Sequence, residues 1–90
     1  MAATVAERLH MDRVAALGCI VSDVHCRGRV TIHHVRPGTA RRDHMRVLPL
    51  CEAHHQTGPR GVAIHEGKKS WRDNYGPEIE YLGQIVDMLA

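Results

Sequence analysis

The sequence predicts a small α+β domain in which a helix, two short strands and three further helices follow one another, held together by bound metal. Three observations support this prediction. The chain has 90 residues, which make one domain, expected to span residues 1–90, with a thin core. Large apolar side chains are scarce, because there is no Phe, one Trp and two Tyr. There are eight His, and domains of this size often depend on a metal or on disulfides.

The first expected helix covers about residues 5–17. Thr4 and Glu7 have the spacing of a capping box, in which each side chain bonds to the backbone of the other residue. Apolar residues follow at roughly helical spacing, and Gly18 is a natural residue to end the helix.

Two short strands are expected next. The segment 29–32 is rich in β-branched residues and runs into His33 and His34, before a turn at Pro37-Gly38. The segment 47–50 is a short apolar run that contains a proline and should be extended. A helix is expected from near Cys51 to just before Gly58.

Two closing helices complete the prediction, after a loop at 58–66. The first should cover 68–75 and place Trp71 and Tyr75 inward. Pro77 should then begin a last amphipathic helix, because proline is favoured in the first helical position. Its expected apolar face consists of Ile79, Leu82, Ile85, Val86 and Leu89.

The three cysteines favour metal binding over disulfide bonds. Disulfide frameworks normally carry an even number of cysteines, so a reducing compartment with thiols as metal ligands fits better. No segment is long and apolar enough to span a membrane, and the N-terminus does not resemble a signal peptide. We therefore expect a cytoplasmic protein without a membrane partner.

The distribution of charge indicates a nucleic acid partner more strongly than the net charge of +2 does. Six arginines lie within twenty residues around the first histidine pair, while acidic residues lie mostly near the ends. Such a cluster is typical of contacts with phosphates, although a solvated loop with scattered arginines is the alternative. The residues expected to contact DNA are Arg36, Arg41, Arg42 and Lys68.

The pair His33-His34 can serve two purposes at once. Side chains alternate along a strand, so one ring can bind a metal while the other faces the substrate as a base. His65 lies beyond a Gly-Pro-Arg-Gly loop and could return to complete a metal shell with His55. The alternative for His65 is a polar residue that fixes its loop. His44 precedes the second strand and could orient the base or a phosphate.

A second metal site is expected around Cys51 and His54. On a helix these residues share one face, whereas His55 is rotated away and can belong to a different site. A structural zinc takes four Cys or His ligands, and Cys19 is a candidate for the third. The position that would complete a C-x-x-C pair with Cys19 is Ser22. Cys26 or His25 could replace it, and a three-ligand site or no zinc at all are the alternatives.

Three motifs together resemble HNH nucleases of phage origin, and among these the Ref family of RecA-dependent nucleases that enhance recombination. The motifs run from Ile32 to Val35, from Leu48 to His55 and from Gly61 to Trp71. The resemblance covers roughly residues 10–85 and implies a small ββα-metal (HNH) fold with flanking helices, stapled by zinc. In that fold a hairpin and a helix hold one divalent ion.

The resemblance also implies roles for individual residues. It identifies His34 as the general base and His33 and His55 as ligands of the catalytic metal, with His65 in the same site. His44 stands where the family has the middle residue of its signature. The zinc knuckle of the family matches Cys19, Cys51 and His54, whereas Ser22 departs from it.

The expected function is metal-dependent hydrolysis of DNA phosphodiester bonds by a phage- or prophage-encoded protein. His34 would take a proton from the attacking water, and the ion would stabilise the charge of the scissile phosphate. Mg, Mn, Ni and Zn are the candidate ions, and an all-histidine site favours Zn or Ni by ligand type. A recombinase or a phage protein is a possible partner. The alternatives are a non-catalytic zinc module that binds nucleic acid or protein, and a degenerate nuclease with a structural role.

Overall fold

The structure is a computed structural model that describes residues 2–36 and 41–90. Its helices and strands follow the predicted order, and the turn expected at Pro37-Gly38 lies outside the described residues. The elements are α1 (Val5–Ala15), β1 (Val30–His34), β2 (Val47–Cys51), the π-helix η1 (Ala53–Thr57), the 3-10 helix η2 (Ile64–Glu66), α2 (Lys68–Tyr75), the 3-10 helix η3 (Glu78–Glu80) and α3 (Tyr81–Leu89).

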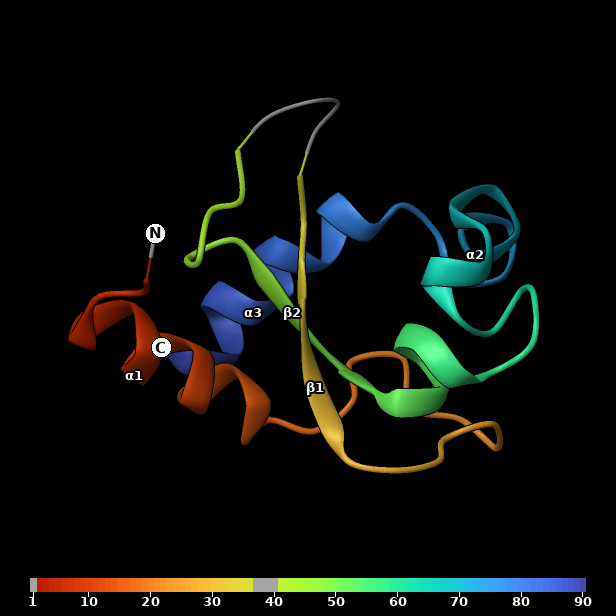
Figure 1. Ribbon diagram of the computed structural model, residues 1–90, viewed down its shortest axis with the longest axis horizontal. Coiled ribbons are helices and arrows are strands. Elements are labelled where there is room, and N and C mark those ends of the chain that lie inside the picture. Colours follow the sequence, from red (N-terminus) through yellow and green to blue (C-terminus); the bar gives the residue numbers. More distant parts are fainter. Residues whose placement is uncertain (1, 37–40) are drawn as a thin grey trace.

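The centre of the molecule is an antiparallel hairpin of β1 and β2, in which His33 lies opposite Leu48 and His34 opposite Val47. Helices α1 and α3 lie beside the hairpin on one side, and η1 and α2 lie on the other (Figure 1). All five residues of β2 are buried, because α1, α3 and η1 contact this strand. The fold class predicted from the sequence, a small α+β domain, is therefore confirmed.

The hydrophobic core consists of two small clusters on the two sides of the hairpin. One cluster packs α1 and α3 against the strands, through the buried residues Val14, Val35, Val47, Leu48 and Ile85. The other joins η2 and α2 to the end of β2, through Val21, Leu50, Ile64 and Trp71. Because each cluster is small, side-chain interactions outside the core are needed to hold the loops in place.

Helix α1 begins as predicted and ends two residues early. The capping box is formed, since the Thr4 side chain accepts a hydrogen bond from the Glu7 backbone and the Glu7 side chain accepts one from Thr4. At the other end of the helix, the Arg13 side chain donates to the Leu89 carbonyl, 3.1 Å away, and links α1 to the end of α3.

The sequence prediction was wrong about where the helix after β2 begins. Cys51 is the last residue of the strand, since the Glu52 backbone donates to the Arg29 carbonyl and extends the ladder. The helix that follows is a single wide turn, η1, closed by a hydrogen bond from the Gly58 backbone to the Ala53 carbonyl. A Cβ atom at Gly58 would collide with that carbonyl, which explains the glycine.

The last helix also begins later than expected. Pro77 has an extended backbone with ψ of 130°, so it lies before η3 rather than inside a helix. The short helix η3 then leads into α3 at Tyr81, and the Tyr81 hydroxyl donates to the Tyr75 carbonyl. Within the described part of the chain, no helix has the length and apolarity needed to cross a membrane.

Candidate metal centres and histidine pocket

Three cysteines and one histidine converge at one end of the hairpin, and we call this group the cysteine site. It contains Cys19, Cys26, Cys51 and His54, which offer ligand atoms within 4.8 Å of one another. The Nδ1 atom of His54 lies 3.6 Å from the Cys19 sulfur, 3.6 Å from the Cys26 sulfur and 3.0 Å from the Cys51 sulfur. The His54 side chain is fully buried.

These distances suit a tetrahedral metal ion. A zinc with bonds of about 2.3 Å to sulfur and about 2.0 Å to nitrogen would hold each sulfur about 3.5 Å from the nitrogen. Because position 22 is a serine, the sequence left open whether Cys26 or His25 would be the fourth member of the group. In the structure Cys26 lies in the group and His25 does not. The loop between Cys19 and Cys26 is long enough for this, and the residues present could hold zinc.

The Cys19 thiol would ionise more readily beside a bound cation. Burial raises the pKa of the Cys19 thiol to about 12, and the nearby Cys51 and Cys26 thiols act in the same direction. Thiolates are the form that binds metal, and they are costly when buried together without positive charge. A cation among the three sulfurs would remove this cost.

Two residues outside the cysteine site hold the His54 ring in its orientation. The Nε2 atom of His54 lies 3.0 Å from Asp23 Oδ1 and 3.2 Å from the Tyr75 hydroxyl. The Tyr75 hydroxyl in turn donates to Asp23, 2.8 Å away. A carboxylate that accepts the second N–H of a metal-binding histidine fixes its tautomer. The sequence offered no signal for Asp23, and Tyr75 was expected only to pack inward.

A second cluster, the histidine triad, lies on the other side of η1. His33 from β1, His55 from η1 and His65 from η2 offer nitrogen atoms within 4.8 Å of one another. The rings of His55 and His65 are 4.7 Å apart between centroids, and that of His33 lies 5.4 Å and 5.7 Å from them. His33 and His55 are buried, whereas His65 is exposed, so the triad opens to solvent on one side.

The triad is poised to bind a cation rather than protons. Burial, reinforced by the charges of His33 and His65, lowers the pKa of His55 to about 4. Burial and His33 also lower the pKa of His65. Neutral imidazoles present the lone pairs that a metal ion needs, so both rings stay available as ligands at neutral pH.

Hydrogen bonds from the strand assign the tautomer of His55. The Thr31 hydroxyl donates to the Leu50 carbonyl, 2.8 Å away, and lies 2.7 Å from Nδ1 of His55. A hydroxyl has one hydrogen, so towards His55 it must accept, which places the ring hydrogen on Nδ1. The lone pair of Nε2 is then free for a metal ion. Thr31 was not singled out in the sequence.

A carboxylate from the C-terminal segment contacts the triad. Glu78 Oε1 lies 3.2 Å from Nε2 of His33, with both side chains largely buried. Burial acts to raise the pKa of Glu78, but the hydrogen bond and charge of His33, with Lys68 nearby, hold it below its ordinary value. An ionised Glu78 can accept the Nε2 hydrogen of His33 and so orient this ring.

His34 turns away from the triad and takes a different partner. Its Nε2 atom lies 2.9 Å from Nδ1 of His44, whereas the neighbouring His33 contacts Glu78. Alternation along β1 therefore separates the two histidines, as the sequence predicted. Burial, followed by the positive charge of Arg42, lowers the pKa of His34. The ring is thus neutral and able to accept a proton at neutral pH.

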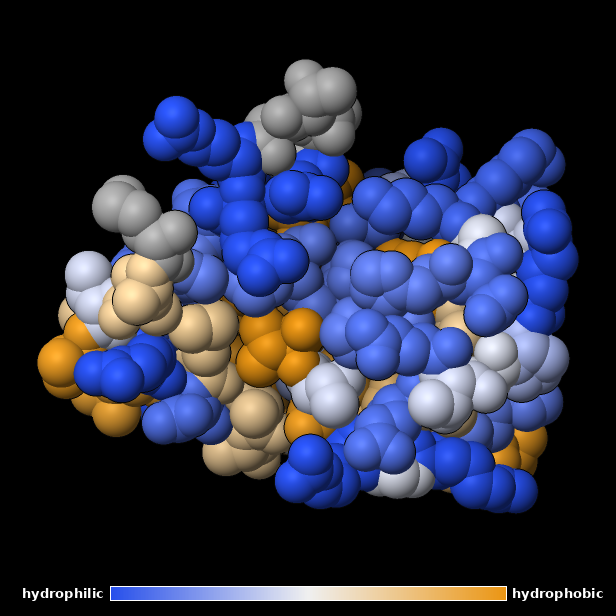
Figure 2. Space-filling view, in the orientation of Figure 1, coloured by the Kyte–Doolittle hydropathy of each residue, from blue (hydrophilic) through white to orange (hydrophobic). Residues whose placement is uncertain are grey.

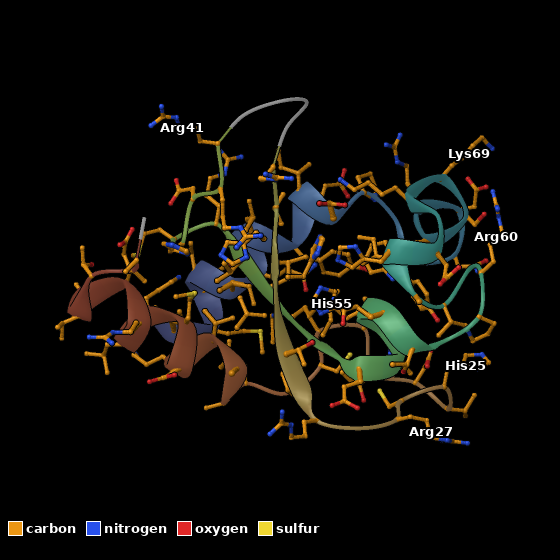
Figure 3. All side chains as sticks on the ribbon, viewed as in Figure 1. His25, Arg27, Arg41, His55, Arg60 and Lys69 are labelled. Atoms are coloured by element: carbon orange, nitrogen blue, oxygen red, sulfur yellow. The ribbon has the colours of Figure 1, made fainter. Side chains whose placement is uncertain are left out.

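The triad and His34 line one open pocket of about 480 Å³, which we call the histidine pocket. The label of His55 in Figure 3 marks its position between β1 and η1. On the face shown in Figure 2, hydrophilic residues dominate over η1 and α2, whereas hydrophobic residues gather over α1. The pocket is therefore a polar hollow lined by both His34 and the histidine triad.

Comparison with known proteins identifies the family. The model of the family described as "Recombination enhancement, RecA-dependent nuclease" matches residues 3–90. The chain belongs to this family. Neither the curated proteins nor the solved structures give a significant match.

Membership of the RecA-dependent nuclease family confirms the resemblance seen in the sequence and supports nuclease activity in general. A nuclease must bind the phosphates of its substrate, and positively charged side chains near the histidine pocket fit this requirement. Arg36, Arg42 and Lys68 line this pocket. Arg41 lies elsewhere, in a neighbouring hollow with Arg42 and His44, and Figure 3 shows its side chain far from His55.

The cysteine site gives a first prediction. We expect Cys51→Ser to release one metal ion per chain and to leave the domain unfolded at temperatures where the parent is folded. The reason is that a structural metal contributes about 10–16 kcal/mol to small zinc domains. Metal content measured by mass spectrometry and thermal unfolding followed by circular dichroism test this.

Ser22→Ala is the matched control, since Ser22 lies beside Cys26 but outside the group that converges on His54. It should keep the metal content and melting temperature of the parent. A Cys51→Ser protein that also keeps both would contradict the assignment of the cysteine site.

Proposed function

We propose that the chain is an HNH-type endonuclease that hydrolyses DNA phosphodiester bonds with the help of a divalent metal ion. The observation that carries this proposal is the shared pocket, in which a cluster of three histidines, a separate neutral histidine and three cationic side chains face one volume. The residues concerned are His33, His55 and His65 as ligands, His34 as base, and Arg36, Arg42 and Lys68 for phosphates.

The triad would hold the catalytic ion, and when bound this ion would supply Lewis-acid stabilisation of the scissile phosphate and the leaving oxygen. Three imidazole ligands suit Zn or Ni by ligand type, whereas Mg and Mn prefer oxygen ligands. All four remain candidates for the active ion. The cysteine site, in contrast, has the three sulfurs and one nitrogen typical of structural zinc.

His34 is proposed as the general base. If its Nε2 hydrogen is donated to His44, the Nδ1 lone pair is available for a proton from the attacking water. The water oxygen forms a bond to phosphorus as the bond to the 3′ oxygen breaks. His44 then acts as a positioning residue, because its acceptor nitrogen orients the His34 ring and stabilises the cation that forms there.

The remaining charges would position DNA. Arg36, Arg42 and Lys68 would contact phosphates at the histidine pocket, and Arg41 would contact a phosphate further along the strand. The family description also supports a recombinase as a partner. We further propose that the protein acts in the cytoplasm of a bacterial host and is of phage or prophage origin.

The role of His34 can be tested by substitution. We expect His34→Ala to lower the rate of plasmid nicking by about 10²–10⁴-fold, because general-base catalysis typically contributes this much. Metal content and melting temperature should stay unchanged, since His34 is not part of the triad. Nicking by the parent should stop in the presence of EDTA.

His25→Ala is the control for the loss of a histidine, because His25 is exposed and lines a different hollow near Gly58. It should nick DNA at the rate of the parent. A His34→Ala protein that cuts as fast as His25→Ala would show that the base is assigned wrongly. A metal-loaded parent that cuts no DNA would favour the non-catalytic alternative.

Glu78 provides a separate test of the triad as a metal site. We expect Glu78→Gln to weaken metal binding at the triad by about 10–100-fold, because carboxylates behind metal-binding histidines contribute about this much. The reason is that the neutral amide no longer offers His33 an ionised acceptor. Metal titration followed by calorimetry measures this affinity, which a purely structural role would leave unchanged.

Glu80→Gln is the matched control, since Glu80 is an exposed carboxylate two residues away on the same short helix. It should bind metal as the parent does, and both variants should keep the metal of the cysteine site. Equal affinity of the triad in Glu78→Gln, Glu80→Gln and the parent would refute the role of Glu78.

A further inference from the structure

A second hollow lies directly beside the histidine pocket, and we call it the flanking pocket. It has a volume of about 420 Å³ and is formed by the end of β1, the helix α2 and the segment before α3. Arg36 and Lys68 line both pockets, so the two hollows meet at these side chains. Glu78 also lines the flanking pocket while its carboxylate contacts His33 of the triad.

The lining of the flanking pocket combines positive charge with apolar surface. Arg36, Lys68 and Arg72 are its cations. Its only carboxylate among the described residues is Glu78, whose charge is engaged by His33. The apolar part of the wall includes Val35, Trp71, Pro77 and Ile79.

Ile79 is the most informative residue of this wall. It is 48% exposed and lies after Pro77 in the segment next to the triad. It therefore presents apolar surface to solvent beside three cations. A nucleotide needs both kinds of surface, because its phosphate is anionic while its sugar and base have apolar faces. A free phosphate would use the cations alone.

We propose that the flanking pocket binds the nucleotide next to the scissile phosphate on the strand that is cut. The inference rests on the proposed function and adds to it a path for the DNA strand. Arg36 and Lys68 would hold the phosphate between the two pockets. Arg72 would contact the next phosphate, and the wall around Ile79 would pack against the sugar and base.

Arg72 is the residue that tests this path, because it lines the flanking pocket but not the histidine pocket. Lys69 on the same helix provides a control of equal charge. Its side chain is 90% exposed, pairs with Asp73 at 3.6 Å and lines neither pocket, and Figure 3 shows it at the outer edge of α2, far from His55. Removing either residue lowers the net charge by one, so an effect of net charge alone would be equal in the two variants.

The binding experiment uses the full chain carrying His34→Ala, so that the DNA stays intact, and a fluorescent single-stranded decanucleotide. We expect Arg72→Ala to weaken binding about tenfold and to reduce the slope of log affinity against log salt by about 0.7, the value for one lost contact to a single strand. Lys69→Ala should change neither by more than about twofold. Ile79→Ser should weaken binding without changing the salt slope, since it removes no charge.

The cleavage experiment uses the active protein with a dinucleotide and a decanucleotide. The parent should show a lower KM for the longer substrate, because only that substrate carries the next phosphate, which Arg72 would contact. In Arg72→Ala this difference in KM should shrink, and in Arg72→Lys it should be partly restored.

Equal weakening by Arg72→Ala and Lys69→Ala would overturn the proposal, since charge anywhere on α2 would then suffice. An unchanged salt slope in Arg72→Ala would overturn it as well. Failure of the proposed function is a different result. A parent that cuts neither substrate would refute the nuclease mechanism, and the binding measurements would still decide whether the strand lies in the flanking pocket.

Discussion

The convergence of three sulfurs on the Nδ1 atom of His54 is the interaction on which the rest of the structure depends. It joins the connection between α1 and β1, the end of β2 and the helix η1. Small domains bury a smaller share of their surface than large ones and often use a metal as well as packing. A metal at this point would add to the two small core clusters.

The same helix that closes the cysteine site positions the triad. His54 and His55 are neighbours in η1, and their rings point to different centres, one towards the sulfurs and one towards His33 and His65. Any loosening of the cysteine site would therefore move His55. The bond between Thr31 and His55 adds a second restraint from β1, so the ring is held from both the helix and the strand. The single helical turn η1 therefore contributes one residue to the cysteine site and one to the triad.

Local sequence signals predicted the elements and most of the site. The β-branched run before His33, the apolar run before Cys51 and the capping box at Thr4 each act within a few residues, and each element formed where it was expected. Adjacent histidines on a strand must diverge, so the separation of His33 from His34 followed from geometry alone. Whether Cys26 or His25 would join the cysteine site could not be predicted, because a loop rather than a regular element carries both.

The errors and omissions have a common physical origin. The end of β2 depends on a backbone hydrogen bond from Glu52 to the Arg29 carbonyl, which lies on the neighbouring strand's side of the hairpin. Asp23 and Glu78 act across 31 and 45 positions of sequence from their histidine partners. Spacing rules for helices and strands relate residues that are only a few positions apart. The sequence around a carboxylate therefore does not indicate that it contacts a distant histidine.

The long-range contact of Glu78 explains why the C-terminal helices belong to the functional unit. Glu78 stands between Pro77 and α3, and the core holds α3 against the hairpin through Ile85. The carboxylate is thus carried to His33 by the packing of a helix that itself offers no residue to the triad. Because the same segment also contributes Pro77 and Ile79 to the flanking pocket, one closing element would orient the metal ligand and shape the path of the DNA. A shortened ββα unit would keep the histidines of β1 and η1 but would lack both of these contributions.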